Sequence, residues 1–466
     1  MRISRRQLLK ATAAGAGTLF LTDVRGGARA QSAPPTGPFF ISVEAQNGWD
    51  PTFLTDPKVD AAFTPWIAQD VRTATGTTIS YAPHIDTAGV KSVYRVGADA
   101  QDFFQKHGSK LLVINGVDNA TVSHDVGPRV AFAGSNREGI PTLAGLYAAA
   151  RGSSLPLSLM TTGGFLSSAG LVPVTRAGNV EVLLGLARSN EANFTAGPSN
   201  RRLIHADGAM ALLRERVRLR DARRAALAGG VPRELAGILK LSATRSADMF
   251  SQYDALADAL DEAAAVASSN RVIPKAASVL AAMKAGACAA AHLATEESFD
   301  THSDHDDNHP GSMQHLLEIV DFLIDTVAND PVLAARGALI VVGSDFGRTK
   351  YNEEGGKDHW PITSMFITGV GAAATLIDGG RVVGASETTL PGGGAANGIV
   401  ARKVKESGGD VVLTDDDDDP AGFPLNAGHV HLALREALGL TNDDVTSRFP
   451  LTSVLPQAPL PLLKRS

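Results

Sequence analysis

The stretch ALIVVGSDFGRT, residues 338–349, decides the fold more clearly than any other part of the chain. It begins with an unbroken apolar run rich in β-branched residues and continues into Ser344 and Asp345. Two further runs, FFISVEA (39–45) and LLVINGV (111–117), have the same character. Continuous apolar strands of this kind are typical of a parallel sheet that helices cover on both faces. The sequence therefore predicts an α/β fold with a mostly parallel sheet.

Helical patterns lie between the predicted strands. From about residue 207 to about 297, alanine, leucine and arginine recur at helical spacing, which predicts a helical accessory lobe inserted into the α/β domain. The segment Ser312–Val327 predicts a further helix, which leads into the strand at 338–343. A helix followed directly by a buried strand is the repeating unit of α/β proteins.

The composition indicates a large globular protein and excludes several classes. Of the 466 residues, 44% are hydrophobic, which suffices for one large or two ordinary domains and is too apolar for a disordered chain. The formal charge of −6 offers no basic footprint for nucleic acid or an anionic membrane. The single cysteine, Cys288, can form no intramolecular disulfide, and its alanine-rich surroundings predict a small buried side chain.

The N-terminus has the features of an export signal. The stretch SRRQLLK (4–10) resembles the twin-arginine signal, and a short, weakly apolar stretch follows that is too mild for a stable membrane span. Ala28 and Ala30 supply the small residues of a cleavage site near Ala30. We therefore predict a signal peptide over 1–30, a mature domain over 31–466, the twin-arginine export machinery as a partner, and a periplasmic or secreted location.

Ionisable residues follow the predicted strands, where open parallel sheets bind their ligands. Asp50 follows the first strand, Ser123 and His124 follow the second, and Asp345 follows the third. The densest cluster, FDTHSDHDDNH (299–309), precedes the last helix. Mixed carboxylates and imidazoles suit a divalent ion such as zinc or manganese better than calcium, which prefers oxygen ligands.

Each of these features also has a simpler interpretation. The charged stretch 300–309 is compatible with a solvated surface loop, and Asp345 with a turn residue. Asp50 and Ser123 are both suited to capping the start of a helix. The aspartate run 415–419 is interpreted as an exposed acidic loop, because adjacent unpaired carboxylates repel one another and stay solvated. Only the joint placement of the others after successive strands favours a shared site.

These residues carry a resemblance to a family. The stretches FDTH (299–302), VVGSDFGRT (341–349) and DH (358–359), in this order, resemble the secreted bacterial family catalogued as domain of unknown function 1501. Ser123-His124 matches a serine–histidine step of that family, and the SDFGRT element is the most specific part. The opening region, EAQNGWD (44–50), departs from the family's glycine-rich pattern.

That family is similar in turn to the alkaline phosphatase and sulfatase superfamily. The resemblance implies an alkaline-phosphatase-like fold that hydrolyses phosphate or sulfate esters with one or two divalent metal ions. It also implies roles for the matching residues: Asp50, Asp300, His302, Asp345 and His359 as metal ligands, and Ser123 as the nucleophile or its positional equivalent. In the mechanism so implied, Arg348 contacts a small anionic ester substrate, and a salt bridge from Arg348 to the helical lobe is an equally open alternative.

Two departures from the superfamily's pattern affect the implied metal site. The first ligand pair is spaced D-x-H in place of D-x-x-x-H, which makes His305 and His309 rival ligands. Phe346 stands where the superfamily has a histidine, and it cannot bind a metal. Two other functions therefore remain open: a non-catalytic envelope protein that retains a degenerate metal site for binding or as a scaffold, and a surface adhesin.

Overall fold

The computed structural model describes residues 37–193, 195, 200, 202–227, 253–391, 393–414, 418–452 and 459–465. The predicted signal peptide lies outside these residues. So do the middle of the predicted helical insertion and residues 415–417 of the aspartate run. Asp419, at the end of that run, is described and pairs with Lys405. Among the described residues, no helix is both long and apolar enough to cross a lipid bilayer.

An eight-stranded sheet forms the centre of the larger of two compact units, which comprises residues 35–188 and 255–466. Seven strands run in one direction, and only β15 is antiparallel to its neighbours. In spatial order the strands are β10 (Val174–Arg176), β9 (Leu159–Thr161), β11 (Ala290–Ser298), β1 (Phe39–Gln46), β12 (Ala338–Ser344), β15 (Ile362–Val370), β8 (Leu111–Asp118) and β16 (Arg381–Val383).

The three strands predicted from the sequence all belong to this sheet, so the mostly parallel α/β fold is confirmed. β1 pairs in parallel with both β11 and β12, which places the carboxyl ends of these three strands side by side. Six of the eight residues in β1 and all seven in β12 are apolar, glycine or serine, and nearly all are buried. Burial on both faces is what their unbroken apolar pattern predicts.

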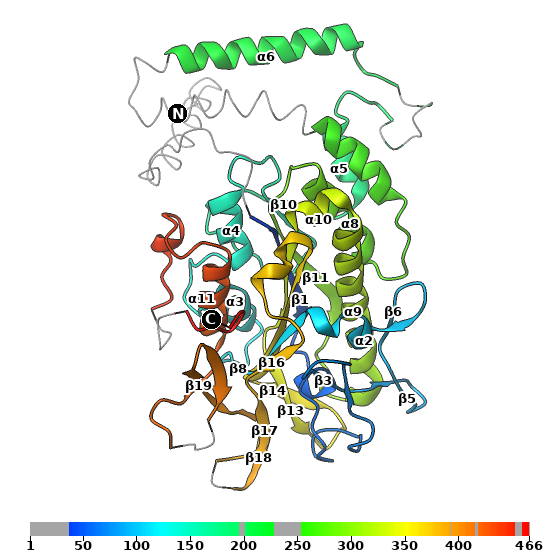
Figure 1. The fold of residues 1–466 in the computed structure, drawn as a ribbon. Coiled ribbons are helices and arrows are strands. Elements are labelled where there is room, and N and C mark those ends of the chain that lie inside the picture. The colour runs from blue at the N-terminus through cyan, green and yellow to red at the C-terminus, as the bar shows by residue number, and fades with distance from the viewer. Residues whose placement is uncertain are drawn as a thin grey trace, which may run out of the picture. The chain divides into compact units, whose positions relative to one another are not determined.

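Helices cover both faces of the sheet (Figure 1). On one side lie α3 (Gly127–Ala133), α4 (Leu143–Arg151) and α11 (Ala427–Ala437), and their apolar residues pack with Phe40, Leu112 and Ile114 of the sheet. On the other side lie α8 (Val272–Lys284) and α9 (His305–Asn329). Shorter helices of this unit include α2 (Phe103–His107), α5 (Val180–Ala187) and α10 (Pro331–Arg336).

Smaller sheets complete the larger unit. One contains β14 (Lys357–Trp360), β13 (Gly347–Tyr351), β18 (Ala395–Ala401) and β17 (Ser386–Thr389), and another contains β20 (Asp410–Leu413), β19 (Lys403–Ser407) and β21 (Phe423–Pro424). Three two-stranded ribbons pair β2 (Arg72–Thr73) with β3 (Ser80–Tyr81), β4 (His84–Ile85) with β5 (Lys91–Ser92), and β6 (Arg95–Val96) with β7 (Gln101–Asp102). The hairpin β13–β14 leaves the end of β12 and carries two of the predicted site residues.

The prediction that the helical insertion extends to about residue 297 is wrong at its C-terminal end. The helix α6 (Asp207–Leu227) belongs to the smaller unit, which includes residues 189–254. In contrast, Ala290–Ser298 forms β11 in the middle of the central sheet. An alanine-rich sequence favours helix locally, but here pairing with β1 and β9 and burial on both faces override that preference.

Part of the charged stretch 299–309, for which a surface loop had also been considered, is helical. The helix α9 begins at His305 and not near Ser312, so His305 and His309 lie in its first turns and are buried. Asp306 and Asp307 lie in the first turn, where carboxylates interact favourably with the helix dipole. What the sequence presents as a polar loop is therefore the start of a long helix against the sheet.

Candidate metal centre

Three of the predicted ligands come together at the carboxyl end of the sheet. Asp300 follows β11, and its Oδ1 atom lies 3.0 Å from Nε2 of His302 and 3.0 Å from Nε2 of His359. The two Nε2 atoms are 3.1 Å apart. His359 lies in β14, directly opposite Arg348 of β13. Two imidazole lone pairs at this separation would repel each other unless a proton or a cation lay between them.

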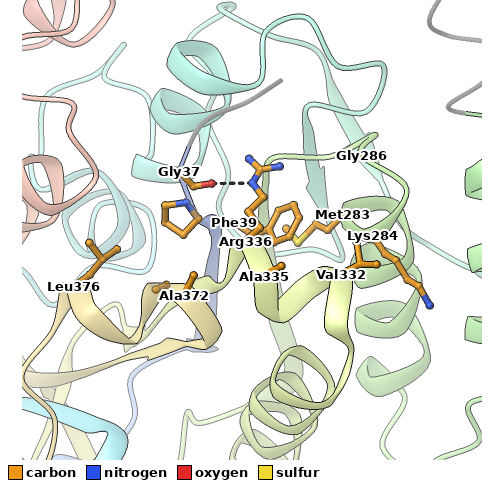
Figure 2. Close-up of a pocket in the computed structure, with 12 residues that line it drawn as sticks. Gly37, Phe39, Met283, Lys284, Gly286, Val332, Ala335, Arg336, Ala372 and Leu376 are labelled. Carbon is orange, nitrogen blue, oxygen red and sulfur yellow. Dashed lines mark hydrogen bonds between the residues drawn. The ribbon is translucent and has the colours of Figure 1, made fainter. Parts of the chain in front are cut away.

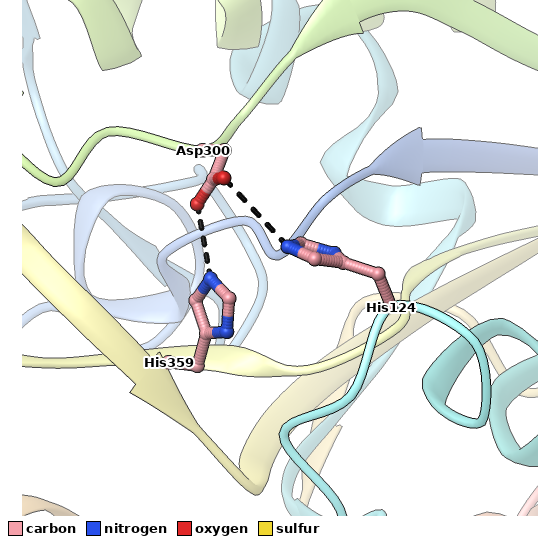
Figure 3. A group of neighbouring side chains, drawn as sticks. All are labelled: His124, Asp300 and His359. Carbon is pink, nitrogen blue, oxygen red and sulfur yellow. Dashed lines mark hydrogen bonds and ion pairs between the residues drawn. The ribbon is translucent and has the colours of Figure 1, made fainter.

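His124 completes the cluster from the loop that follows β8. Its Nε2 atom lies 3.6 Å from Oδ2 of Asp300, while His359 approaches Oδ1, as Figure 3 shows. One ligand atom from each of His124, Asp300 and His359 lies within 4.8 Å of the others. A single divalent ion with ligand bonds near ~2.0–2.2 Å would require only a modest closing of these side chains.

The three imidazole rings are all held in the same way. In each ring Nδ1 has a hydrogen-bond acceptor, so Nε2 is the atom directed towards Asp300. Because a backbone carbonyl can only accept, Nδ1 of at least one ring must carry the proton. Metal-binding histidines are typically oriented by such an acceptor on the other nitrogen. The acceptors are Asp345 for His124 at 3.2 Å, Asp358 for His302 at 2.8 Å, and the Val122 carbonyl for His359 at 3.0 Å.

Asp300 has the charge that a metal ligand needs. Partial burial opposes ionisation of this carboxyl group, but the contacts of Asp300 with His359 and Arg348 outweigh it and lower the pKa of Asp300. The carboxylate is therefore ionised over the whole neutral range. It remains partly exposed, as do His124, His302 and His359, so a substrate can reach the cluster.

Arg348 is buried, and its guanidinium group donates hydrogen bonds to Asp300 and to three backbone carbonyls. Its Nε donates to the carbonyl of Gly48 at 2.7 Å, and Nη1 donates to the carbonyl of Lys357 at 3.1 Å. Its Nη2 donates to the carbonyl of Asn47 and, at 3.0 Å, to Asp300. With 0% of its side chain exposed and these donors engaged, Arg348 orients Asp300, and the substrate contact implied by the family resemblance is not what its geometry favours.

Asp345 reaches the cluster only through His124. It is almost fully buried, and its Oδ1 accepts a hydrogen bond from Ser344 Oγ at 3.0 Å. Burial raises the pKa of Asp345, although the bonds from Ser344 and His124 oppose this. The structure therefore gives Asp345 the position of a residue that orients His124, where the sequence had suggested a direct ligand.

Asp50 lies in a separate buried cluster. One of its oxygens accepts from the ammonium group of Lys357 and the other from the backbone and hydroxyl of Thr52. Burial disfavours the charged carboxylate, but Lys357 and His305 outweigh it and lower the pKa of Asp50. Both oxygens thus have partners, and an internal cation already balances the charge of the residue expected to be the first metal ligand.

The rival ligands His305 and His309 belong to this buried cluster. Their rings stack 4.3 Å apart, and Nε2 of His309 accepts from the backbone NH of Asp50 at 2.9 Å. Nδ1 of His305 lies 2.6 Å from Thr301 Oγ1. Burial lowers the pKa of His305 to about 4 and that of His309 well below its usual value, so both rings are neutral near pH 7.

Phe346 forms the apolar floor under the histidines. It is fully buried, and its ring centroid lies 4.4 Å from that of His359 and 5.0 Å from that of His124. Gly48, at φ +85°, permits this packing, because a Cβ atom there would lie 2.3 Å from the Phe346 ring. A phenyl ring therefore fills the position where the superfamily resemblance called for a ligand.

Ser123 is exposed in the loop before α3. Its Oγ accepts a hydrogen bond from the backbone NH of Asp125 at 3.3 Å, and its carbonyl accepts from Val126 and Gly127. These contacts resemble the capping role that the sequence left open. Because its Oγ acts as an acceptor in this contact, the hydroxyl hydrogen of Ser123 can be donated to another acceptor. Ser123 also directly precedes His124 of the cluster.

Two other features could be mistaken for the site. His107, Asp321 and Asp325 form a second group of possible ligands, but Lys106 already donates to both carboxylates at 2.6 Å. A cavity of about 640 Å³ lies at the opposite end of the strands, where β1 begins (Figure 2). Its lining is mostly apolar, and its one stacked cation, Arg336, lies over Phe39, so it offers no comparable chemistry.

The comparison with protein families agrees with the resemblance in the sequence. Residues 98–399 match the family described as "Protein of unknown function (DUF1501)". This match covers well over half of the chain, and the chain therefore belongs to that family. It includes His124, Asp300, His302 and His359 and thus the whole candidate cluster. No curated protein matches the chain.

Sequence reasoning missed three residues that shape this site. His124 had been noted only as the neighbour of Ser123, although its place after a buried strand was the available signal. Asp358 had been noted only as the first half of an Asp-His step, and nothing in the sequence connects it with His302. Lys357 carried no signal, because a lysine beside charged residues is normally a surface residue.

We expect Asp300→Asn to lower zinc and manganese affinity by more than about tenfold, because the amide removes the negative charge on which three imidazoles converge. Metal content after dialysis, measured by plasma mass spectrometry, checks this. Asp307→Asn, on the exposed side of α9, is the matched control. Equal metal content in both variants would remove Asp300 from the site.

Stability is expected to fall as the pH drops from about 6.5 towards 4. In this window an unfolded histidine, with its usual pKa near ~6.5, binds a proton, whereas His305 with its pKa of about 4 does not. The unfolded state therefore gains protons, and the free energy of unfolding decreases. Urea denaturation across this range should show a shallower pH dependence for His305→Gln than for wild type, while a variant of exposed His205 should keep the wild-type slope.

Proposed function

We propose that this protein is an exported, metal-dependent hydrolase of phosphate or sulfate esters with an alkaline-phosphatase-like fold. The observation that carries the proposal is the orientation of three imidazole rings, each held at Nδ1 and each presenting Nε2 to the ionised Asp300. This cluster lies at the carboxyl end of a mostly parallel sheet, where such folds bind their ligands. It is open to solvent, as a catalytic centre requires.

The donor set suits one zinc or manganese ion. Imidazole nitrogens with one carboxylate are ligands that these metals accept, whereas calcium prefers oxygen alone. A bound divalent ion would polarise the ester oxygens and lower the pKa of a hydroxyl group or water molecule beside it. A second ion has less support, since Phe346 cannot bind it and Lys357 already balances the charge of Asp50.

Residues around the cluster have distinct parts in this proposal. Ser123 is the proposed nucleophile: its Oγ would attack phosphorus or sulfur, the alcohol would leave, and water would then hydrolyse the seryl ester. Arg348 is a positioning residue, because its guanidinium fixes the carboxylate of Asp300. Asp345 orients His124 in the same way.

A second candidate is an envelope protein that binds the metal for assembly and does not catalyse. The buried Phe346 favours it, because a phenyl ring occupies a position expected to supply a ligand. Metal binding without turnover of any phosphate or sulfate ester would select this candidate over the hydrolase.

We expect Ser123→Ala to reduce turnover of 4-nitrophenyl phosphate or 4-nitrophenyl sulfate by about 100-fold or more while metal content stays unchanged, because the covalent route is lost. Acid-quenched wild-type enzyme should carry the phosphoryl or sulfuryl group on the peptide that contains Ser123, detected by mass spectrometry. Ser153→Ala, in a turn after α4, is the control. Unchanged turnover in Ser123→Ala would assign the attack to water.

Export through the twin-arginine route is a further part of the proposal, and it rests on the sequence of residues 1–30. We expect the double variant Arg5→Lys, Arg6→Lys to accumulate in the cytoplasm, because the receptor reads paired guanidinium groups and not charge alone. Cell fractionation followed by immunoblotting measures this, with Arg2→Lys as the control. Normal export of the double variant would contradict the twin-arginine assignment.

A further inference from the structure

A polar cavity of about 590 Å³ opens directly beside Asp300 and His302. One wall is a stripe of α9 formed by Asn308, Gly311, Ser312 and His315, whose spacing puts them on one face of the helix. The other wall comes from the end of β11 and the segment that follows it. The cavity is therefore continuous with two of the proposed metal ligands.

The side chains that line the cavity are all polar. Hydroxyl, amide, carboxylate and imidazole groups are supplied by Glu297, Ser298, Ser303, Asn308, Ser312 and His315. The described residues that line the cavity include no lysine or arginine and no aliphatic or aromatic hydrocarbon side chain. Glu297 supplies a lining carboxylate outside the metal cluster, and its Oε1 lies 3.2 Å from Nδ1 of His315. The cavity thus offers many hydrogen-bonding groups, among them the carboxylates of Glu297 and Asp300.

The backbone is bent to form this cavity. The pairing of β1 with β11 is interrupted between Ala294 and Ser298, and Glu296 within this bulge has φ +59°. Asp304, immediately before α9, has φ +48°. Left-handed backbone at residues other than glycine is energetically unfavourable and is concentrated at functional sites, where bulges commonly redirect side chains. Here the bulge directs Glu297 and Ser298 to the cavity wall.

We propose that this cavity binds the alcohol part of the ester substrate and that this part is an uncharged, hydroxyl-rich group such as a sugar ring. The inference rests on the proposed function, because it assigns the ester group itself to the metal cluster. A ring with several hydroxyl groups can donate to Glu297 and Asn308 and accept from serine hydroxyls at the same time. The volume lies in the range of ordinary small-molecule pockets.

Other substrate classes fit the lining less well. A lipid chain would gain little, because the described lining has no hydrocarbon side chain to bury it. A nucleotide or a polyanion would bring further negative charge to walls whose described residues carry carboxylates and include no lysine or arginine. A flat aromatic alcohol would leave the polar groups of the wall without partners.

Gly311 offers a way to fill the cavity without disturbing the protein. It lies in α9, and a Cβ atom added there would meet no atom within 4 Å beyond its chain neighbours and the backbone of its own helix. The side chain of Gly311→Trp would therefore extend from the cavity wall into the space of the proposed sugar. Gly178→Trp is the matched control, because Gly178 also has open space at its Cβ position and lies outside the cavity lining.

The test compares glucose 6-sulfate with 4-nitrophenyl sulfate, and glucose 6-phosphate with 4-nitrophenyl phosphate. We expect Gly311→Trp to lower kcat/KM for the sugar ester by about tenfold or more, equivalent to one or two lost hydrogen bonds, and to lower it several-fold less for the aryl ester, whose ring makes fewer hydrogen bonds with the wall. Gly178→Trp should change neither. Equal losses on both esters, or no loss on the sugar ester, would overturn the proposal.

Binding distinguishes failure of this inference from failure of the proposed function. Saturation-transfer NMR with glucose 6-sulfate should show contacts to the sugar-ring protons for wild type and Gly178→Trp and none for Gly311→Trp, whether or not turnover occurs. Ser312→Ala, which removes one hydroxyl group without adding bulk, should weaken the same signals. Absence of sugar contacts in wild type would overturn the inference, whereas contacts without hydrolysis would overturn only the hydrolase.

Discussion

The site depends on the hydrogen bonds that the buried guanidinium group of Arg348 donates. It ties together three segments that are far apart in the sequence: the turn after β1, the strand β14 and the segment that carries Asp300. Four oxygen acceptors surround a cation that has left water, so the cost of burying the charge is offset by hydrogen bonds with well-defined geometry. Loss of these contacts would free Asp300 and the turn at Gly48 together.

The distribution of positive charge determines which carboxylates remain available to a metal. Asp50 is neutralised by Lys357 in a fully buried pair, and the neighbouring histidines are kept neutral by burial. Asp300, in contrast, shares Arg348 with three backbone carbonyls and stays partly exposed. The protein thus places one charged cluster inside and leaves another at the surface. Only the surface cluster combines an ionised carboxylate with imidazole nitrogens that solvent and ligands can reach.

The arrangement around α9 connects the two clusters with the cavity. The same helix supplies His305 and His309 to the buried cluster and the face with Asn308 and Ser312 to the cavity wall. Because successive side chains point in different directions around the helix axis, one short charged stretch serves two environments. A sequence that looks like a single metal-binding motif therefore divides between the interior and the surface.

The sequence by itself determined the central strands, the α/β class and the neighbourhood of the site, because unbroken apolar runs predict buried parallel strands and the residues after them must meet at one edge. It also determined Asp300, His302 and His359 as a group, through spacing that resembles a family. It could not determine that Ala290–Ser298 is a strand, since local alanine content favours helix. Only the tertiary structure decided that Asp50 pairs with Lys357, that Arg348 is buried, and that His124 joins the cluster in front of Asp345. Each of these depends on contacts between residues more than 170 positions apart, or on burial, and neither is encoded in a local pattern.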